Sequence, residues 1–96
     1  MKISILTPTC RDQFLEWQIK ALKQQTLTDF EWVLVDDLYS LTKERVRALV
    51  GESFPVIHIS PTKQETYPVI ASACNDGLVY AKGKLVFFMN DYVIPL

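Results

Sequence analysis

The side chains of this sequence that are best suited to chemistry form three short polar clusters, each placed directly after an apolar run. The clusters are Thr7-Pro8-Thr9, Asp36-Asp37 and Asn90-Asp91. Their oxygen atoms suit Mg²⁺ or Mn²⁺ far better than zinc, and such ions are commonly held by one or two carboxylates together with substrate phosphates. If the clusters meet in the fold, they predict a site for a phosphate-bearing ligand, with a nucleotide as the leading candidate.

The carboxylates in these clusters have no matching Lys or Arg close by in the sequence, apart from Arg11. Carboxylates that face one another are unfavourable in their ionised form unless a cation or a donor-rich ligand joins them. A bound ligand is therefore the first interpretation. The alternative is structural, because loops are polar in general and Asp favours the N-terminal ends of helices.

Other kinds of site are poorly supported. Cys10 and Cys74 lie far apart without a CxxC spacing, and His58 is the only histidine, so neither a zinc site nor thiol redox chemistry is expected. His58 lies inside an apolar stretch and is predicted to be a strand residue rather than a ligand. Residues 7–12 contain no glycine, so a glycine-rich phosphate loop is absent there and a nucleotide must be held by side chains and a metal.

Length and composition indicate one small globular domain. The chain has 96 residues, of which 49% are hydrophobic and 22% are charged. Ten Lys and Arg against eleven Asp and Glu leave no basic excess, so nucleic acid is not an expected partner. No apolar run approaches the roughly 20 residues needed to cross a bilayer, so we expect no transmembrane segment and a cytoplasmic location.

The elements that must position the clusters alternate between strand and helix. Apolar strands are predicted at residues 2–7, 30–35, 54–59 and 84–89, and helices at 12–25, from Ser40 or Thr42 to Gly51, and from Pro68 to Gly83. The fourth strand, with its unbroken apolar run, is expected to be covered on both faces. The alternation is typical of a parallel sheet built from right-handed crossovers.

The order of these strands decides where the clusters lie. If strands one to three wind one way and the fourth returns beside the first, the order is 3-2-1-4, and ligands bind at the carboxyl ends of the strands where the order reverses. All three clusters follow carboxyl ends, so they are expected to share one edge of the sheet. Pro8 is expected to end the first strand, because it has no N–H group to continue a ladder.

Several short motifs occur in an order that resembles a known family. They are Gln25-Thr26, Asp29-Phe30-Glu31, Val35-Asp36-Asp37, Asn75-Asp76-Gly77 and Ala81-Lys82-Gly83. Together, over nearly the whole chain, they resemble the N-terminal nucleotide-binding half of family-2 glycosyltransferases of the GT-A fold. The resemblance implies an α/β, three-layer, Rossmann-like half-domain with a mostly parallel four-stranded sheet and helices on both faces.

By this resemblance, the chain is the donor-binding portion of an enzyme that transfers a sugar from a nucleoside-diphosphate sugar to an acceptor. The Pro8-Thr9 turn and Asp37 would contact the base and ribose, and Asp91 with Asn90 would hold Mn²⁺ or Mg²⁺ at the diphosphate. A metal there would stabilise the charge that builds on the leaving phosphate oxygens. The full set assigned to the nucleotide is Pro8, Thr9, Arg11, Asp36, Asp37 and Asn75.

The chain departs from the family pattern at several places. The metal motif Met89-Asn90-Asp91 has one carboxylate where the family usually has two or three, so metal binding is expected to be weak. Leu38-Tyr39 replaces the usual Gly-Ser, and Cys74 stands where an Arg is common. The acceptor half and catalytic base of the family follow the metal motif, so residues 1–96 are expected to be a single truncated domain with little or no transferase activity of its own.

Two other functions stay open. A non-catalytic α/β module could use the same edge, or the exposed edge of the fourth strand, to bind a protein partner or a second copy of itself. A receiver-like domain is the third hypothesis, but its acid pair would come early in the chain, whereas Asp36-Asp37 follows the second strand.

Overall fold

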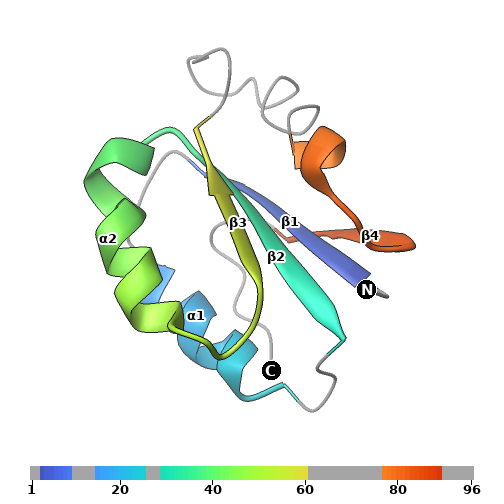
Figure 1. Ribbon diagram of the computed structural model, residues 1–96, viewed down its shortest axis with the longest axis horizontal. Helices are drawn as coiled ribbons and strands as arrows, with labels where there is room; N and C mark the ends of the chain where they lie inside the picture. The colour runs from blue at the N-terminus through green and yellow to red at the C-terminus, as the bar shows by residue number, and fades with distance from the viewer. Residues whose placement is uncertain (1–2, 10–14, 26–28, 61–76, 90–96) are drawn as a thin grey trace.

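A computed structural model describes residues 3–9, 15–25, 29–60 and 77–89 of the chain. Within them, four parallel strands form one sheet: β1 (Ile3–Thr9), β2 (Phe30–Asp36), β3 (Val56–Ile59) and β4 (Leu85–Phe88). Their order is β3-β2-β1-β4 (Figure 1). The predicted α/β class, the parallel sheet and the strand order are confirmed.

Strand β2 is the centre of the core. All seven of its residues are buried, because it lies between β1 and β3 and is covered on both faces. Trp32 and Leu34 belong to one apolar cluster, whereas Val33 and Val35 belong to a second cluster with Leu6 of β1. A strand buried on both faces is expected to be almost continuously apolar, as the sequence of β2 is.

Helices α1 (Leu15–Lys23) and α2 (Tyr39–Val50) cover the face of the sheet that carries Trp32 (Figure 1). Their buried apolar side chains recur at helical spacing: Leu15, Ile19 and Leu22 on α1, and Val46 and Val50 on α2. On the opposite face, residues 77–80 are helical. A Cβ on Gly77 would come within 2.0 Å of Leu6 Cδ1, so the missing side chain lets this turn lie directly on the sheet. Helical segments therefore lie on both faces, as expected.

Two of the sequence predictions about helices are only partly covered by the structure. The third helix was predicted from Pro68 to Gly83, and its first nine positions lie outside the described residues. In the described part the helix ends at Tyr80, before the predicted end. No described helix is long and apolar enough to cross a membrane, and the cytoplasmic location stays a prediction.

Strand β1 continues through Pro8 to Thr9, so the prediction that Pro8 ends the strand is wrong. The reason is the side of β1 on which Pro8 lacks an N–H group. Leu6 O accepts the N–H of Met89 over 2.9 Å, so the backbone groups of Leu6 face β4. By alternation the nitrogen of Pro8 faces the same side, where the described pairing with β4 ends at Leu6 and Phe88. Pro8 thus coincides with the end of the β1–β4 ladder, and β1 continues to pair with β2.

The start of α2 differs from the prediction that Ser40 or Thr42 caps it. Leu38 occupies the N-cap position and makes no side-chain cap hydrogen bond. The carboxylate of Asp36, at the end of β2, instead accepts the N–H of Leu38 over 2.8 Å. The predicted end of the helix is confirmed, because Gly51 adopts a φ of 55° and donates its N–H to a carbonyl one turn earlier.

Strand β4 is an edge strand with an exposed apolar surface, so the prediction that it is covered on both faces is wrong for the residues described. Leu85, Phe87 and Phe88 are 62%, 60% and 54% exposed, whereas Met89 is buried. In the described sheet β4 has β1 as its only neighbour, and α1 and α2 pack over the strands beyond it. Coverage depends on which elements lie above a strand, and an apolar run alone does not reveal that.

Candidate functional site

The first two polar clusters meet at the carboxyl edge of the sheet. In the register of β1 and β2, Thr9 lies opposite Asp36 and Pro8 lies opposite Val35. The N–H of Asp37 donates to Thr9 O over 3.0 Å, which ties the ends of the two strands together. Pro8-Thr9 and Asp36-Asp37 therefore share one edge, as the sequence predicted, and their nucleotide-binding role stays a prediction.

The carboxylate of Asp36 is fully buried and makes three hydrogen bonds. Its Oδ1 accepts the N–H of Leu38 (2.8 Å), and its Oδ2 accepts the Thr42 hydroxyl (2.5 Å) and contacts His58 Nε2 (3.0 Å). Burial raises the pKa of this carboxyl, but the hydrogen bonds from His58, Thr42 and Leu38 outweigh it, so the pKa lies below the ordinary value of 3.8. Asp36 is thus an ionised brace that joins β2, β3 and the start of α2.

The sequence did not identify His58 as a partner of Asp36. It lies in β3, as predicted, and the register places it beside Leu34, two residues before Asp36 on the same face of the sheet. The ring of Tyr39 packs edge-on against the His58 ring, with 4.8 Å between centroids. The available signal was one polar residue inside an apolar strand, but its partner could be identified only from the register.

Asp36 and Asp37 have different roles at this edge. Both oxygens of Asp36 are engaged inside the protein, so the side chain orients the backbone that leads from Asp37 to Leu38. Asp37 itself is half-buried, and its N–H is fixed to β1. A backbone held in this way is already in place before any ligand arrives, which reduces the entropy cost of binding.

A second buried polar network fastens the segment that precedes β4 to the sheet. Glu31 of β2 is 1% exposed, and its Oε2 accepts the Ser4 hydroxyl and the N–H of Lys82, both over 2.6 Å. Ser4 Oγ in turn accepts the N–H of Gly83 over 2.7 Å. A Cβ on Gly83 would lie 2.5 Å from Ser4 N and 2.6 Å from Ile3 C, so glycine is required for this close approach.

The network gives a physical reason why the motifs Asp29-Phe30-Glu31 and Ala81-Lys82-Gly83 occur in one chain. The carboxylate of the first motif holds the backbone of the second, and this contact fixes where β4 begins. Strand β4 then runs parallel to β1, and the N–H of Met89 donates to Leu6 O. Its carboxyl end is directed to the same edge as Thr9.

The remaining predicted site residues, Arg11, Asn75, Asn90 and Asp91, lie outside the described residues. Their roles stay predictions. Within the part of the chain that is described, no group of three or more His, Cys, Asp or Glu side chains could hold a metal ion. The predicted Mn²⁺ or Mg²⁺ site depends on Asn90 and Asp91, so that finding does not bear on it.

Comparison by sequence relates the chain to known proteins. Residues 4–93 match the family model described as glycosyl transferase family 2. A Haemophilus influenzae protein described as an uncharacterized glycosyltransferase is 34% identical over 90 residues, which are 93% of this chain and 29% of that protein.

Crystal structures of S. aureus TarS share the fold. TarS 1-349 has a TM-score of 0.77 at 21% identity, over 95% of this chain and 27% of that chain. The structures of TarS 1-349 in complex with UDP and with UDP-GlcNAc also have TM-scores of 0.77, at 21% and 22% identity and again over 95% of this chain. The chain spans less than a third of the length of these relatives.

Proposed function

Because this chain belongs to glycosyltransferase family 2, we propose that it binds the nucleotide part of a nucleoside-diphosphate sugar, the donor from which a sugar is transferred to an acceptor. The observation that carries the proposal is the edge where Pro8-Thr9 and Asp36-Asp37 meet, tied by the bond from the Asp37 N–H to Thr9 O. TarS, which shares the fold, has been crystallised with UDP and with UDP-GlcNAc. UDP is therefore the first nucleotide to test.

The residues of β1 and β2 have separate roles in this proposal. Pro8 and Thr9, at the carboxyl end of β1, and Asp37 contact the base and ribose. Arg11 and Asn75 complete the nucleotide site. Asp36 keeps the turn after β2 in place through its buried bonds rather than by donating or accepting at the ligand.

The diphosphate end of the donor is assigned to Asn90 and Asp91. The direction of β4 supports this assignment, because its carboxyl end leads to the same edge as those of β1 and β2. Mn²⁺ or Mg²⁺ bound there would supply positive charge to the diphosphate as it leaves. With a single carboxylate in the pair, we expect this ion to bind weakly in the absence of nucleotide.

Nuclear magnetic resonance titration with UDP and Mg²⁺ tests the proposal. The amide resonances of Thr9 and Asp37 should shift as UDP is added. A hydrogen bond to a charged group contributes about 1.5–3 kcal/mol, so Asp37→Ala should weaken UDP binding by roughly tenfold or more.

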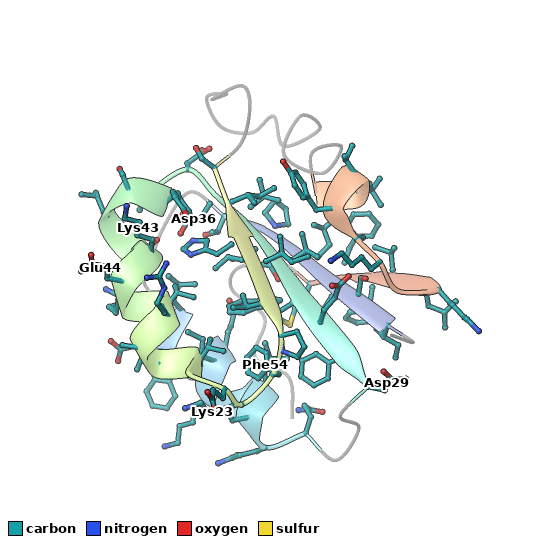
Figure 2. All side chains as sticks on the ribbon, in the orientation of Figure 1. Lys23, Asp29, Asp36, Lys43, Glu44 and Phe54 are labelled. Carbon is teal, nitrogen blue, oxygen red and sulfur yellow. The ribbon has the colours of Figure 1, made fainter. Side chains whose placement is uncertain are left out.

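The matched control is Asp29→Ala. Asp29 is an exposed carboxylate directly before β2, at the opposite end of the strand from Asp36 (Figure 2), so its removal changes the net charge equally without touching the proposed site. UDP affinity should stay unchanged in this variant. Equal losses in the two variants, or no shift of Thr9 and Asp37 at millimolar UDP, would refute the proposal.

A second candidate function, a binding module, is favoured by the exposed apolar strand β4. Here we propose a second copy of the chain as the occupant, because two β4 edges can pair about a twofold axis. Leu85 and Phe87 on one face, and Phe88 on the other, would then lie beside apolar side chains of the second copy. Three such side chains bury on the order of 300 Å² per copy, well below the roughly 800 Å² per partner of a stable interface. The dimer is therefore expected to be weak.

Sedimentation over a range of concentrations separates this candidate from the first. The average mass should rise with concentration, and Phe87→Lys should abolish the rise. Trp17→Lys is the control, because Trp17 on α1 is 59% exposed, almost the same as Phe87. A mass that stays monomeric at every concentration would eliminate the second candidate.

A further inference from the structure

A cavity of about 200 Å³ lies between α2 and β3, and it is connected to the proposed donor site through His58, which lines the cavity and holds Asp36. The two elements run side by side, and β3 is at one end of the described sheet (Figure 1). None of the residues assigned to the nucleotide or the metal lines this cavity. Its walls are Tyr39, Lys43, Val46, Arg47, Val50, Gly51, Val56 and His58.

Two cations give the cavity a positive wall. Lys43 and Arg47 are four residues apart on α2, so their side chains lie on the same side of the helix (Figure 2 labels Lys43). Among the described residues, neither has a carboxylate partner within 4.0 Å, and the ion pairs found there involve other side chains. Both side chains are exposed, and two neighbouring cations with no carboxylate in contact repel each other and favour an anion between them.

The opposite wall adds hydrogen-bond donors. The N–H of Trp32 donates to Pro55 O over 3.0 Å, so the backbone groups of residues 55 and 57 face β2. By alternation, the N–H groups of Val56 and His58 point away from β2, on the side of β3 where the described sheet has no further strand. The Tyr39 hydroxyl is a further donor among the lining side chains.

The size of the cavity limits what it can hold. Pockets for drug-sized ligands measure roughly 300–1,000 Å³, so 200 Å³ is too small for a nucleoside-diphosphate sugar. Lysine and arginine are the side chains that bind phosphate, and the valines at positions 46, 50 and 56 leave room for a short organic group. We propose that this cavity binds a small phosphomonoester, with its phosphate held by Lys43 and Arg47.

Amide resonances provide the test, with inorganic phosphate and glycerol 3-phosphate as probes and chloride to keep the ionic strength constant. At about pH 7.5 a phosphomonoester, with a second pKa near 6, is mainly a dianion. Resonances of residues 39–51 and 56–58 should shift and saturate with both probes. Glycerol 3-phosphate should bind at least as tightly as inorganic phosphate, because the apolar part of the cavity contacts its organic group.

The decisive variant is Lys43→Gln with Arg47→Gln. Loss of both charge-assisted contacts should weaken binding roughly tenfold or more. His58 is left unchanged, because it also holds Asp36. The control is Lys20→Gln with Lys23→Gln, which removes the same charge from α1 beside Glu16, and its affinity should stay within about twofold, since exposed charges at that range are screened.

Several results would overturn the proposal. The amide resonances would fail to saturate, or resonances near lysines over the whole surface would shift. Saturation with inorganic phosphate but not with glycerol 3-phosphate, or equal losses of affinity in the two double variants, would overturn it as well. If the Lys43/Arg47 double variant fails to fold, the two single variants are measured instead, and at least one must lose affinity. UDP should not displace the phosphomonoester, so failure here is distinguishable from failure of the donor-site proposal.

Discussion

Replacing Glu31 by alanine tests how the chain is anchored between β2 and β4. The carboxylate is 1% exposed and accepts the Ser4 hydroxyl and the Lys82 N–H, both over 2.6 Å. In Glu31→Ala the buried Ser4 hydroxyl and the partly buried Lys82 N–H would both lose this acceptor. Ser4 Oγ, which also accepts the N–H of Gly83, would lose the partner that holds it in place.

The size of the effect follows from these two bonds. A hydrogen bond to a charged group contributes about 1.5–3 kcal/mol, so the loss of two amounts to roughly 3–6 kcal/mol. Removal of a buried carboxylate also relieves a desolvation cost, which offsets part of this loss. We therefore expect Glu31→Ala to lower the free energy of unfolding by about 2–4 kcal/mol, out of the roughly 5–15 kcal/mol that is typical of a domain.

Urea denaturation measures this loss, and hydrogen exchange locates it. The amide protons of Lys82 and Gly83 should lose their protection in Glu31→Ala, because their acceptors are removed or freed to move. Glu31→Gln keeps an acceptor oxygen and should lose less stability than the alanine variant.

Glu44→Ala is the control for the Glu31 variants. Glu44 is an exposed carboxylate on α2 (Figure 2), so its removal should change stability by no more than about 0.5 kcal/mol. The reasoning fails if Glu31→Ala is as stable as Glu44→Ala, or if Gly83 keeps its protection.

Two further predictions concern Asp36 and Gly83. The pKa of Asp36 in the folded protein lies below its ordinary value of 3.8, so its contribution to stability is fully present above that value and is lost as the pH falls through the lowered pKa. Asp36→Asn should therefore be less stable at neutral pH and lose less stability on acidification, measured by urea denaturation from about pH 6 to pH 2. Parallel pH profiles of the two proteins would contradict this. Gly83→Ala should lower stability by about 1–3 kcal/mol, because the added Cβ overlaps the backbone of Ile3 and Ser4. Gly77→Ala should lower stability less, since there the overlap is with the end of the Leu6 side chain and not with backbone. A thermal denaturation series that ranks the two variants the other way would show that the β1 backbone can move aside.

Much of the fold could be predicted because it depends on local periodicity. The apolar run of β2 and the repeat of Leu15, Ile19 and Leu22 on α1 are properties of the chain itself, and Gly51 marks the end of α2 by its backbone freedom alone. The order 3-2-1-4 followed from the general rules for parallel crossovers, and it placed Pro8-Thr9 and Asp36-Asp37 at one edge.

The predictions that failed concern features that neighbours decide. Pro8 remains inside β1 because the side on which it lacks an N–H lies beyond the described pairing with β4. The start of α2 depends on a carboxylate supplied by β2 rather than on Ser40 or Thr42. Strand β4 has an apolar sequence but is exposed, because no described helix covers it.

The sequence by itself determined the four strands, the helices α1 and α2 and the two clusters of the candidate edge, because each depends on residues close together in the chain. Only the tertiary structure decided that His58 pairs with Asp36, which is 22 positions away, and that Glu31 holds Lys82, which is 51 positions away. Buried polar groups must be satisfied, but the partner that satisfies them is whichever group the strand register brings within reach. The register is a property of the assembled sheet and is absent from any single strand.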